Sequence, residues 1–417
     1  MKNFKDSGIE WLGEIPEHWE VSKFKYFYRS NMGETILAQD LKDDGIPIYS
    51  ATEDDKFFGR IKNAINILNI NDFVIPARGN SIGAVKIVKE KSTCTQTTIF
   101  SKQFKEMNPY YVYYFLLGYR KFLFEFTQTA IPQITISQVN DNPILYPPLK
   151  EQEQIANFLD KKCEQIKNFI EKKEKLINLL KEQKQALINE TITKGLDKNV
   201  NFKDSGIEWL GEIPQHWEIR KLKYLGNFQN GISINSEAFG AGYPFVSYGD
   251  VYNNISIPSN VKGLINSTII DRKIYSVKKG DIFFTRTSET IDEIGISSVC
   301  LKTIENAVFA GFLIRFRADK KVLDSNFAKF HFRRNLNQYF FAKENGLVTR
   351  ASLGQELLGK LPVIIPPLKE QKQIAYFLDE KCKKIDLLIE KTEKQIKLIK
   401  EYKTTLINQA VCGRINL

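Results

Sequence analysis

The stretch PPLKEQEQIANFLDKKCEQIKNFIEKKEKLINLLKEQKQALIN, residues 147–189, decides the fold of this chain. After its opening Pro pair it contains no Pro or Gly, and the residues that dominate it, Lys, Glu, Gln, Leu and Ile, favour helices. Its apolar residues recur at spacings of three and four, which is the heptad pattern of a coiled coil. The stretch therefore predicts a helix roughly 65 Å long. Its narrow apolar stripe requires a partner helix.

The expected partner lies in the same chain. Residues 366–408 repeat the stretch without a gap, and 28 of the 43 positions are identical. Two near-identical units pair through equivalent surfaces, so we expect the helices to be antiparallel and related by a pseudo-twofold axis. In the first copy, Lys162, Lys173 and Gln183 interrupt the apolar seam. The side chains predicted to form the interface are Ile155, Leu159, Ile166, Phe169, Leu180, Ile374, Leu378, Ile385, Leu388 and Ile399.

A second repeat opens each half of the chain. Residues 3–20 and 201–218, which we call the leaders, are identical at 17 of 18 positions and differ only at Glu17 against Gln215. All four Trp residues lie in the leaders. Trp can stack on nucleobases, but the Gly and Pro turns of the surrounding IEWLGEIPxHW segment favour a role in anchoring the leader to a domain core.

Residues 21–146 and 219–365, which we call the first and second middles, differ in sequence but share landmarks in the same order. Runs of β-branched and aromatic residues predict strands at 72–75, 84–88, 281–285 and 312–316. Aromatic-lined helices are predicted at 108–126 and 325–341, with Asn108 as the cap of the first and Pro109 at its first position. Each middle is therefore expected to be a mixed α/β domain.

The predicted fold class is α+β, with two mixed α/β domains separated by two long antiparallel coiled-coil helices. The expected division of the chain is a leader with the first middle (1–146), the first helix (147–196), a leader with the second middle (197–365), and the second helix (366–417).

Composition limits the classes of partner. The chain has 417 residues and a formal net charge of +11, which suits a polyanion such as nucleic acid. No run of apolar residues is long enough to span a membrane, so no membrane association is expected. The five Cys residues show no metal-ligand spacing. Together with the absence of an apolar signal segment, this predicts a cytoplasmic protein.

The sequence contains no convincing catalytic motif. Residues 108–111 read NPYY, which resembles the Asn-Pro-Pro-aromatic motif of adenine methyltransferases but lacks its second Pro, and no Gly-rich cofactor loop precedes it. No GxxxxGK[ST] phosphate loop is present. The three His residues lack the spacing of metal ligands. We therefore predict neither catalytic nor metal-binding residues in this chain.

Candidate DNA-contacting residues lie after a predicted strand and ahead of each long helix, at corresponding places in the two middles. Arg can bond guanine, and Asn can bond adenine, through two hydrogen bonds each. The alternative is that the Arg residues form internal salt bridges. The candidates are Arg78, Asn80, Ser81, Gln133 and Thr135 in the first middle, and Arg286, Ser288, Thr349 and Arg350 in the second.

Three motifs occur twice: GEIPxHW in the leaders, D-x(4,5)-R followed by IG in the middles, and PPLKEQxQIAxFLD at the helix starts. Through these motifs nearly the whole chain resembles the specificity subunit of type I restriction–modification enzymes. The resemblance implies two target recognition domains that read a bipartite, asymmetric double-stranded DNA target, with the helices as the spacer between them. It also implies a non-catalytic subunit.

The same resemblance implies partners. The chain would assemble with two modification (methyltransferase) subunits, which use S-adenosylmethionine, and two restriction subunits, which use ATP and Mg²⁺. No cofactor is expected in this chain. Three alternatives stay open: a specificity module of a type IIB-like system, a coiled-coil assembly scaffold without DNA readout, and a free-standing methyltransferase, which the missing cofactor motifs oppose.

Overall fold

The chain folds into two compact units, which are described separately. Unit 1 comprises residues 1–174 and 393–417, and unit 2 comprises residues 175–392. Each unit thus contains one leader, one middle and part of both long helices. The computed structural model describes residues 3–125, 132–233, 236–288, 293–334, 337, 339–341, 343 and 351–417, without the side chains of Ser236, Ser288, Ala351 and Ser352.

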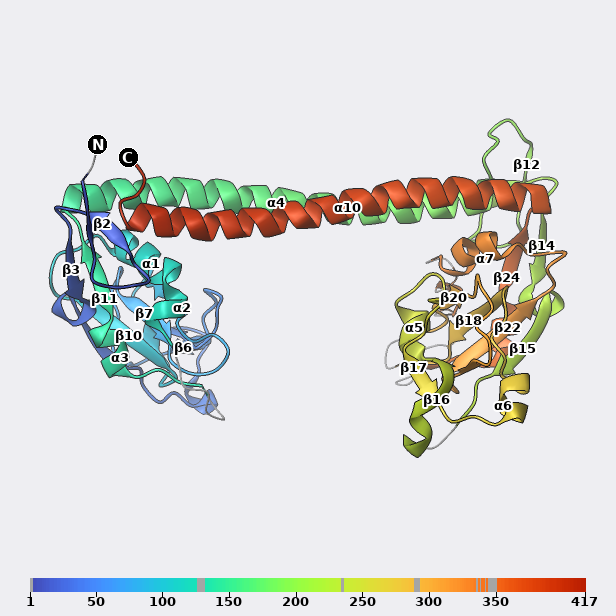
Figure 1. Cartoon of the computed structure of the whole chain (residues 1–417), viewed down its shortest axis with the longest axis horizontal. Coiled ribbons are helices and arrows are strands. Elements are labelled where there is room, and N and C mark those ends of the chain that lie inside the picture. Colours follow the sequence, from blue (N-terminus) through green and yellow to red (C-terminus); the bar gives the residue numbers. More distant parts are fainter. Residues whose placement is uncertain are drawn as a thin grey trace. The chain divides into compact units, whose positions relative to one another are not determined.

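Both predicted long helices are present (Figure 1): α4 is Leu149–Lys194 and α10 is Leu368–Val411. In unit 1, Ile155 and Leu159 near the start of α4 share a buried cluster with Ile407 near the end of α10. In unit 2 the end of α4 shares a buried cluster with the start of α10. The helices are therefore antiparallel, and the predicted α+β fold with a tandem duplication is confirmed.

The seam between the helices departs from the predicted one. Phe169 and its counterpart Leu388 are 39% and 51% exposed, so they lie outside the seam. Their neighbours Ile170 and Ile389 are half-buried instead. Alternating steps of four and three residues lead from Leu159 through Cys163 and Ile166 to Ile170, whereas Phe169 breaks that alternation. Among the other predicted interface residues, Ile155, Leu159, Ile166, Ile374 and Leu378 are buried, and Leu180, Ile385 and Ile399 are half-buried.

Unit 1 contains the first middle as two sheets followed by short helices. The main sheet is antiparallel, in the order β4 (Tyr28–Met32), β10 (Thr98–Gln103), β7 (Phe73–Pro76) and β8 (Lys86–Ile87). The second sheet has the order β6 (Gly59–Ile61), β5 (Ile46–Tyr49) and β9 (Thr93–Cys94). The helices are α1 (Pro109–Gly118), α2 (Arg120–Leu123) and α3 (Ile136–Asp141). The strands predicted at 72–75 and 84–88 correspond to β7 and β8.

Unit 2 repeats this topology with added elements. Its main sheet has the order β15 (Gly226–Asn230), β22 (Leu313–Ala318), β18 (Asp281–Thr285) and β20 (Ser297–Val299). The second sheet has the order β17 (Gly263–Ile265), β16 (Phe239–Val246) and β21 (Val308–Phe309). The helices are α5 (Tyr248–Tyr252), α6 (Ile269–Ile274), α7 (Ser325–Phe332) and α9 (Gln355–Lys360). The helix predicted at 325–341 begins as expected but ends at Phe332, with Arg333 as its C-cap, so its predicted extent was too long. Part of the remaining predicted range lies outside the described residues.

Each leader is a hairpin held to a long helix by a buried Trp. The hairpins are β1 (Phe4–Asp6) with β2 (Glu14–Pro16), and β12 (Phe202–Asp204) with β13 (Glu212–Pro214). Trp19 is fully buried and donates from Nε1 to Glu151 Oε2 at 3.1 Å, while Trp217 donates to Glu370 Oε2 at 3.0 Å. The predicted anchoring role is confirmed for these two residues.

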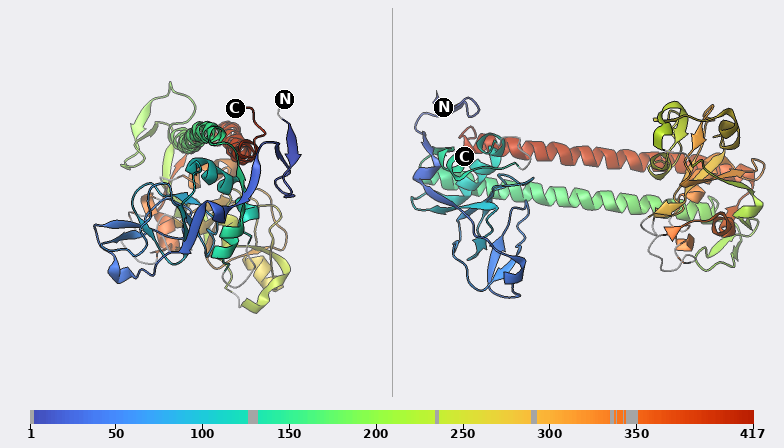
Figure 2. Two further views of the ribbon diagram at one scale, coloured as in Figure 1. Left: turned by 90° about the vertical axis from the view of Figure 1, so that its left-hand side faces the viewer. Right: turned by 90° about the horizontal axis from the view of Figure 1, so that it is seen from below.

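The C-terminal segment packs against the leader of unit 1. The guanidinium of Arg414 donates to the carbonyls of Leu12 and Glu14. The end of α10 and the first hairpin accordingly lie together in all views (Figure 2).

Each middle begins and ends in one two-stranded antiparallel sheet. In unit 1, β3 (Glu20–Lys23) pairs with β11 (Pro143–Tyr146). In unit 2, β14 (Glu218–Lys221) pairs with β24 (Pro362–Ile365). The chain therefore leaves the middle beside the point where it entered, directly ahead of the long helix.

A buried glutamine joins each middle to its helix. Gln152 is fully buried, accepts from the Asn108 backbone N–H at 2.8 Å and donates to the Pro147 carbonyl at 2.8 Å. Gln371 makes the equivalent bonds to Asp324 and Pro366, also at 2.8 Å. Asn108 caps α1 as predicted, since its side chain accepts from two backbone N–H groups of the first turn.

The repeated IG motif has a structural explanation. Gly83 and Gly295 adopt φ of +69° and +71°, in the left-handed region that favours glycine. A Cβ atom on Gly83 would lie 2.5 Å from the ring of Phe124, and one on Gly295 would lie 2.3 Å from Phe341. The motif therefore lets an aromatic side chain pack directly on the backbone.

Replacing Gly83 with Ala is expected to destabilise unit 1 by about 2–4 kcal/mol, because it combines backbone strain with a clash against Phe124. Gly79→Ala is the matched control: φ there is +81°, but nothing lies within 4 Å of the added Cβ. It should cost only about 1 kcal/mol. Thermal denaturation of the two variants measures the difference, and equal melting temperatures would contradict the packing argument.

Candidate nucleic-acid interface

In unit 1 the loop after β7 pairs with the segment ahead of α3. Ala77 accepts a hydrogen bond from the Ile134 backbone N–H at 2.9 Å, and Gly79 donates to the Pro132 carbonyl at 3.3 Å. Arg78 and Gln133 form an isolated antiparallel bridge. The structure thus brings together two candidates that are 55 residues apart in the sequence, Arg78 and Gln133.

Unit 2 builds the same pairing after β18. Here β19 (Thr287–Ser288) pairs with β23 (Ala351–Ser352), and Arg286 accepts from the Leu353 backbone N–H at 2.7 Å. Two of the candidate residues, Thr349 and Arg350, lie outside the described residues, as does the side chain of Ser288.

Arg78 and Arg286 do not occupy equivalent positions, contrary to the sequence alignment. The Arg286 backbone donates to Phe312 and accepts from Leu353, whereas in unit 1 it is Ala77 that donates to Thr97 and accepts from Ile134. Arg286 is therefore the counterpart of the buried Ala77, and Arg78 is the counterpart of Thr287. A shift of one residue gives the two arginines different surroundings in otherwise similar loops.

Arg78 is available to a ligand. Its side chain is exposed and has no ion-pair partner in the part of the chain that the structure describes. Asn80 and Gln133 beside it are also exposed, and Ser81 is half-buried. Within the described residues, no internal salt bridge competes for these donors and acceptors, which is the arrangement that base or phosphate contact requires.

Arg286 lies in a hollow. Together with Phe239, Phe245, Phe312 and Thr287 it lines a cavity of about 570 Å³. Phe312 and Phe239 are 63% and 48% exposed at this cavity. Mostly apolar walls with a few polar groups are typical of ligand-binding pockets.

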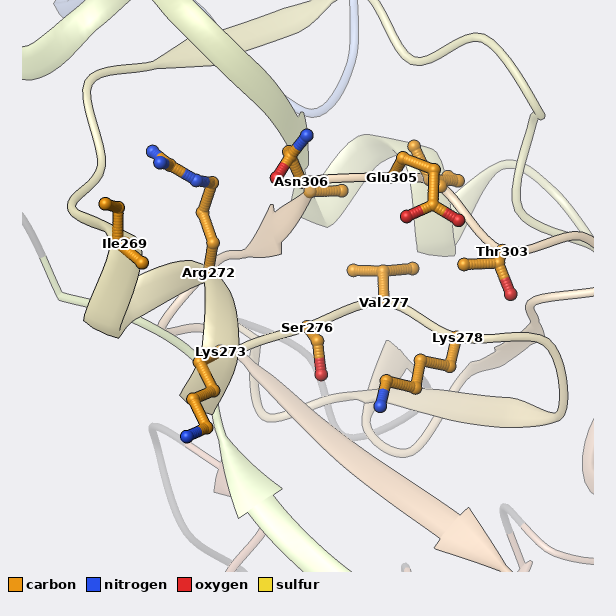
Figure 3. A pocket seen from close by; sticks show the side chains of 11 residues that line it. Ile269, Arg272, Lys273, Ser276, Val277, Lys278, Thr303, Glu305 and Asn306 are labelled. Atoms are coloured by element: carbon orange, nitrogen blue, oxygen red, sulfur yellow. The ribbon is translucent and has the colours of Figure 1, made fainter.

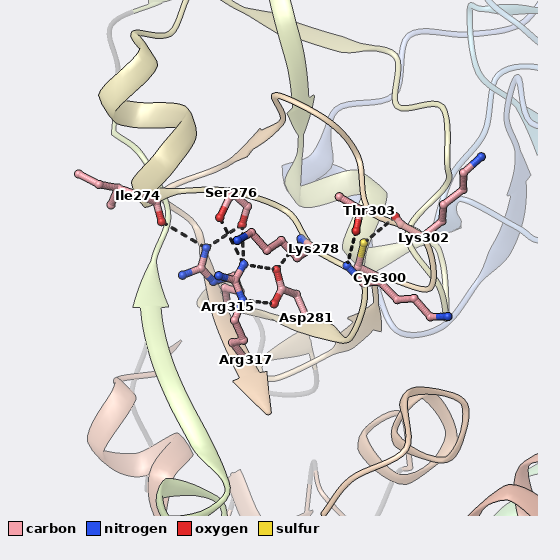
Figure 4. A network of polar contacts seen from close by, with 10 residues as sticks. Ile274, Ser276, Lys278, Asp281, Cys300, Lys302, Thr303, Arg315 and Arg317 are labelled. Atoms are coloured by element: carbon pink, nitrogen blue, oxygen red, sulfur yellow. Dashed lines mark hydrogen bonds and ion pairs between the residues drawn. The ribbon is translucent and has the colours of Figure 1, made fainter. Parts of the chain in front are cut away.

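The aspartate of the repeated D-x(4,5)-R motif is structural. Asp72 and Asp281 each accept from the backbone N–H three residues earlier, at 2.8 and 2.7 Å. Asp281 is buried and also accepts two hydrogen bonds from Arg317, at 2.6 and 2.7 Å (Figure 4). These bonds raise the pKa of Arg317, while burial lowers the pKa of neighbouring Arg315 to about 10. The aspartate of the motif thus holds the start of the strand in place through these hydrogen bonds. The arginine is the residue of the motif that can reach a ligand.

Thr135 has a structural role in addition to its exposure. Its hydroxyl accepts from the Gln138 backbone N–H at 3.2 Å, and the Gln138 side chain accepts in return from the Thr135 backbone N–H at 2.8 Å. This reciprocal capping box begins α3.

Sequence reasoning missed a cationic hollow beside α6. Arg272, Lys273 and Lys278 line a cavity of about 480 Å³ together with Thr303, Asn306 and one carboxylate, Glu305 (Figure 3). The Arg272 guanidinium lies 3.6 Å from the ring centre of Tyr243, which holds it in place. The signal in the sequence was the pair of basic dipeptides at 272–273 and 278–279, close to the strand predicted at 281–285.

The described residues offer little reactive chemistry. All five Cys are buried and unpaired, and burial raises the pKa of the Cys300 thiol to about 11. His331 is fully buried, which lowers its pKa well below the usual value. Within the described ranges, no cluster of three His, Cys, Asp or Glu side chains could hold a metal ion. None of the helices in these ranges has the length and apolarity needed to cross a membrane.

Known proteins resemble the chain along its length. It matches the family described as type I restriction modification DNA specificity domain twice, over residues 16–188 and 214–398. It is 28% identical over 435 residues to the type I restriction enzyme MjaVIII specificity subunit of Methanocaldococcus jannaschii, covering 100% of this chain and 96% of the relative. The putative MjaX specificity subunit of the same organism is 26% identical over 449 residues, covering 100% and 97%.

Solved structures share the fold. A chain from a study of complex assembly and conformational transition of the type I R–M system matches 96% of this chain and 99% of its own length, with a TM-score of 0.73 at 12% identity. The HsdS subunit from Thermoanaerobacter tengcongensis matches 96% and 98%, with a TM-score of 0.54 at 14% identity. Since the family match covers most of the sequence in two tandem copies, each spanning one middle and much of one helix, this chain belongs to the family of type I restriction–modification specificity subunits.

Proposed function

We propose that this chain selects the DNA target of a type I restriction–modification enzyme, and that each middle reads one half of a bipartite, asymmetric sequence. The observation that carries the proposal is the paired loop of each unit: one backbone arrangement occurs twice, but with Arg78 exposed in one copy and Arg286 in an aromatic hollow in the other. Two loops with the same backbone arrangement but different side chains are suited to reading two different half-sites.

In this proposal Arg78, Asn80 and Gln133 contact the first half-site, and Arg286 with its neighbours contacts the second. Arg, Asn and Gln can read base edges in the major groove. The cationic hollow of Arg272, Lys273 and Lys278 would hold the DNA backbone, since phosphate contacts position a protein without specifying sequence. The net charge of +11 supports the same polyanionic ligand.

The chain would act as a non-catalytic part of a larger enzyme. It would assemble with two modification subunits, which supply S-adenosylmethionine-dependent methyl transfer, and with two restriction subunits, which use ATP. The domain division that we propose places the leader and target recognition domains at 1–146 and 197–365, and the spacer helices at 147–196 and 366–417. The duplicated surfaces of the leaders suit two copies of the same partner.

The direct test is to map methylated adenines in the DNA of a host that expresses this chain with its modification subunit. A single bipartite motif, absent when this chain is omitted, is the expected result. Methylation at unrelated sites, or sequence-selective methylation without the chain, would support a coiled-coil scaffold instead.

Arg78→Ala is expected to weaken binding to the target by about 1–3 kcal/mol and to relax one base position, if the guanidinium bonds a base edge. If it bonds phosphate, the loss should be nearly uniform across sequences and the salt dependence smaller. Competition binding with single-base variants of the target at several salt concentrations separates these outcomes. Lys172→Ala, which removes one exposed charge from α4, is the control, and an equal effect of both changes would show that Arg78 has no specific contact.

A further inference from the structure

The exposed surfaces of the two leaders are unusually alike. Nine matched leader positions are exposed in both copies, and eight of them carry the same residue. The identical pairs begin at Asn3, Lys5, Asp6, Gly8, Glu10, Glu14, His18 and Glu20, each repeated 198 residues later. Exposed positions of duplicated sequences normally diverge, because substitutions there usually change stability by less than about 0.5 kcal/mol.

The long helices provide an internal comparison, because they belong to the same repeat. Between residues 147–189 and 366–408, 23 matched positions are exposed in both copies, and only 11 are identical. The seam residues Ile155, Leu159, Cys163, Ile166 and Ile170 are all retained in the second copy. The helices therefore diverged on their solvent side while keeping their core, whereas the leaders kept their solvent side as well.

Contacts within the chain explain some of the retained leader residues. Asp6 and Asp204 accept from the backbone N–H of Gly8 and Gly206 at 2.9 Å, which shapes the hairpin turn. His18 lies 2.7 Å from the carboxylate of Glu151, and His216 makes the same contact with Glu370 at 2.8 Å. These residues are retained for the fold of the leader.

Among the described residues, four charged pairs make no contact that both copies share: Lys5, Glu10, Glu14 and Glu20, with their copies Lys203, Glu208, Glu212 and Glu218. In unit 2, Glu218 pairs with Arg220 at 2.6 Å and Glu208 with Lys343 at 3.8 Å. Unit 1 shows no ion pair for Glu20 or Glu10 among the described residues. Arg220 corresponds to Ser22, so an internal pair common to both copies does not account for the retention of these residues.

The charge of this surface identifies the class of partner. Three exposed carboxylates and one exposed ammonium per leader make the leader surface locally acidic on a chain whose net charge is +11. An acidic face repels DNA phosphates, so DNA is not the ligand here. The same exposed charged residues on two non-identical units suit two copies of one protein with a complementary basic surface.

We infer that the acidic faces of the two leaders, Glu10/Glu14/Glu20 and Glu208/Glu212/Glu218, are equivalent docking surfaces for two copies of one protein, the modification subunit, which contacts them through basic side chains. This inference rests on the proposed function, and specifies which surface of the chain holds that partner. Each leader binds one copy independently of which DNA half-site its middle reads.

The test reverses the charges of one leader at a time in the full-length chain. Glu10→Lys, Glu14→Lys and Glu20→Lys are combined in one variant, the equivalent three changes in unit 2 in a second, and all six in a third. Native mass spectrometry and sedimentation with purified modification subunit give the number of copies bound. The expected numbers are two for the original chain, one for each triple variant and none for the sixfold variant, with affinity at each altered site reduced about ten-fold or more.

The helices supply the matched control. Glu153→Lys, Glu164→Lys and Gln165→Lys introduce the residues that the second helix carries at the same positions, Lys372, Lys383 and Lys384. This variant has a similar change in charge, on exposed positions of the same unit, and should still bind two copies. Equal losses in the control and the leader variants would overturn the inference, because charge alone would then explain the effect.

Two further readouts separate this inference from the proposed function. Thermal denaturation verifies that the leader variants are folded, and binding of each variant to the mapped DNA target shows whether the middles are intact. Two copies of the modification subunit bound to the sixfold variant would overturn the inference while leaving DNA selection in place. A folded original chain that binds no modification subunit would overturn both the inference and the assembly part of the proposed function.

Discussion

Replacing the second middle, residues 219–365, with a copy of the first, residues 21–146, should convert the asymmetric target into an inverted repeat of one half-site. The leaders are nearly identical and the helices keep the same core, so the difference between half-sites is expected to come from the middles, whose sequences differ. With two copies of the Arg78 loop, the protein would present the same contacts to both half-sites. Methylation mapping with the modification subunit measures the new target directly.

The structure provides clean junctions for this exchange. The first middle enters through β3 and leaves through β11, which pair with each other, and the second does the same through β14 and β24. The pairs Val21 with Leu145 and Ile219 with Ile364 occupy corresponding places in these sheets. The buried Gln152 and Gln371 accept from the backbone of the two middles in the same way. The copied middle can therefore form the same strand pairing and the same glutamine contacts at its new place in the chain.

The reciprocal exchange is the control. A protein with two copies of the second middle should methylate an inverted repeat of the other half-site. Neither hybrid should methylate the original asymmetric target. The proposal fails if either hybrid is folded and assembled but still methylates the original asymmetric sequence, because recognition would then reside outside the middles.

Leu159→Asp is expected to have the largest effect on stability. Leu159, on α4, is fully buried in a cluster that also contains residues of the first leader and of the end of α10. The substitution removes a core side chain and places a carboxylate in an apolar cluster, which costs about 3–5 kcal/mol or more. A unit of this size should lose roughly 10 °C in melting temperature, measured by circular dichroism at constant protein concentration.

Phe169→Asp tests the register of the seam. The same charge is introduced ten residues along the same helix, but Phe169 is 39% exposed. Its cost should be below about 1 kcal/mol, apart from the loss of its contact with the Lys173 ammonium, which lies 5.3 Å from the ring centre. If Phe169→Asp destabilised the protein as much as Leu159→Asp, Phe169 would lie in the seam, as the sequence alone predicted.

The sequence by itself determined the long helices, their pairing and the tandem organisation. These features depend on signals that are local or repeated: forty residues without Pro or Gly, a heptad pattern, and near-identical leaders. The Asn108 cap and the anchoring role of Trp19 also followed from local residue chemistry. Such features can be predicted because neighbouring residues alone nearly suffice to establish them.

Only the tertiary structure decided the register of contacts between distant segments. After Ile166, both Phe169 and Ile170 fit a helical spacing, and packing against the opposite helix selects Ile170. Similarly, Arg78 and Arg286 align in the two sequences. The hydrogen bonds from the Ile134 and Leu353 backbone N–H groups show that Arg286 matches Ala77, one residue before Arg78. A difference of one residue leaves the local pattern almost unchanged, yet it moves a side chain from the core or a hollow to the solvent, because the partner strand or helix determines where each residue lies.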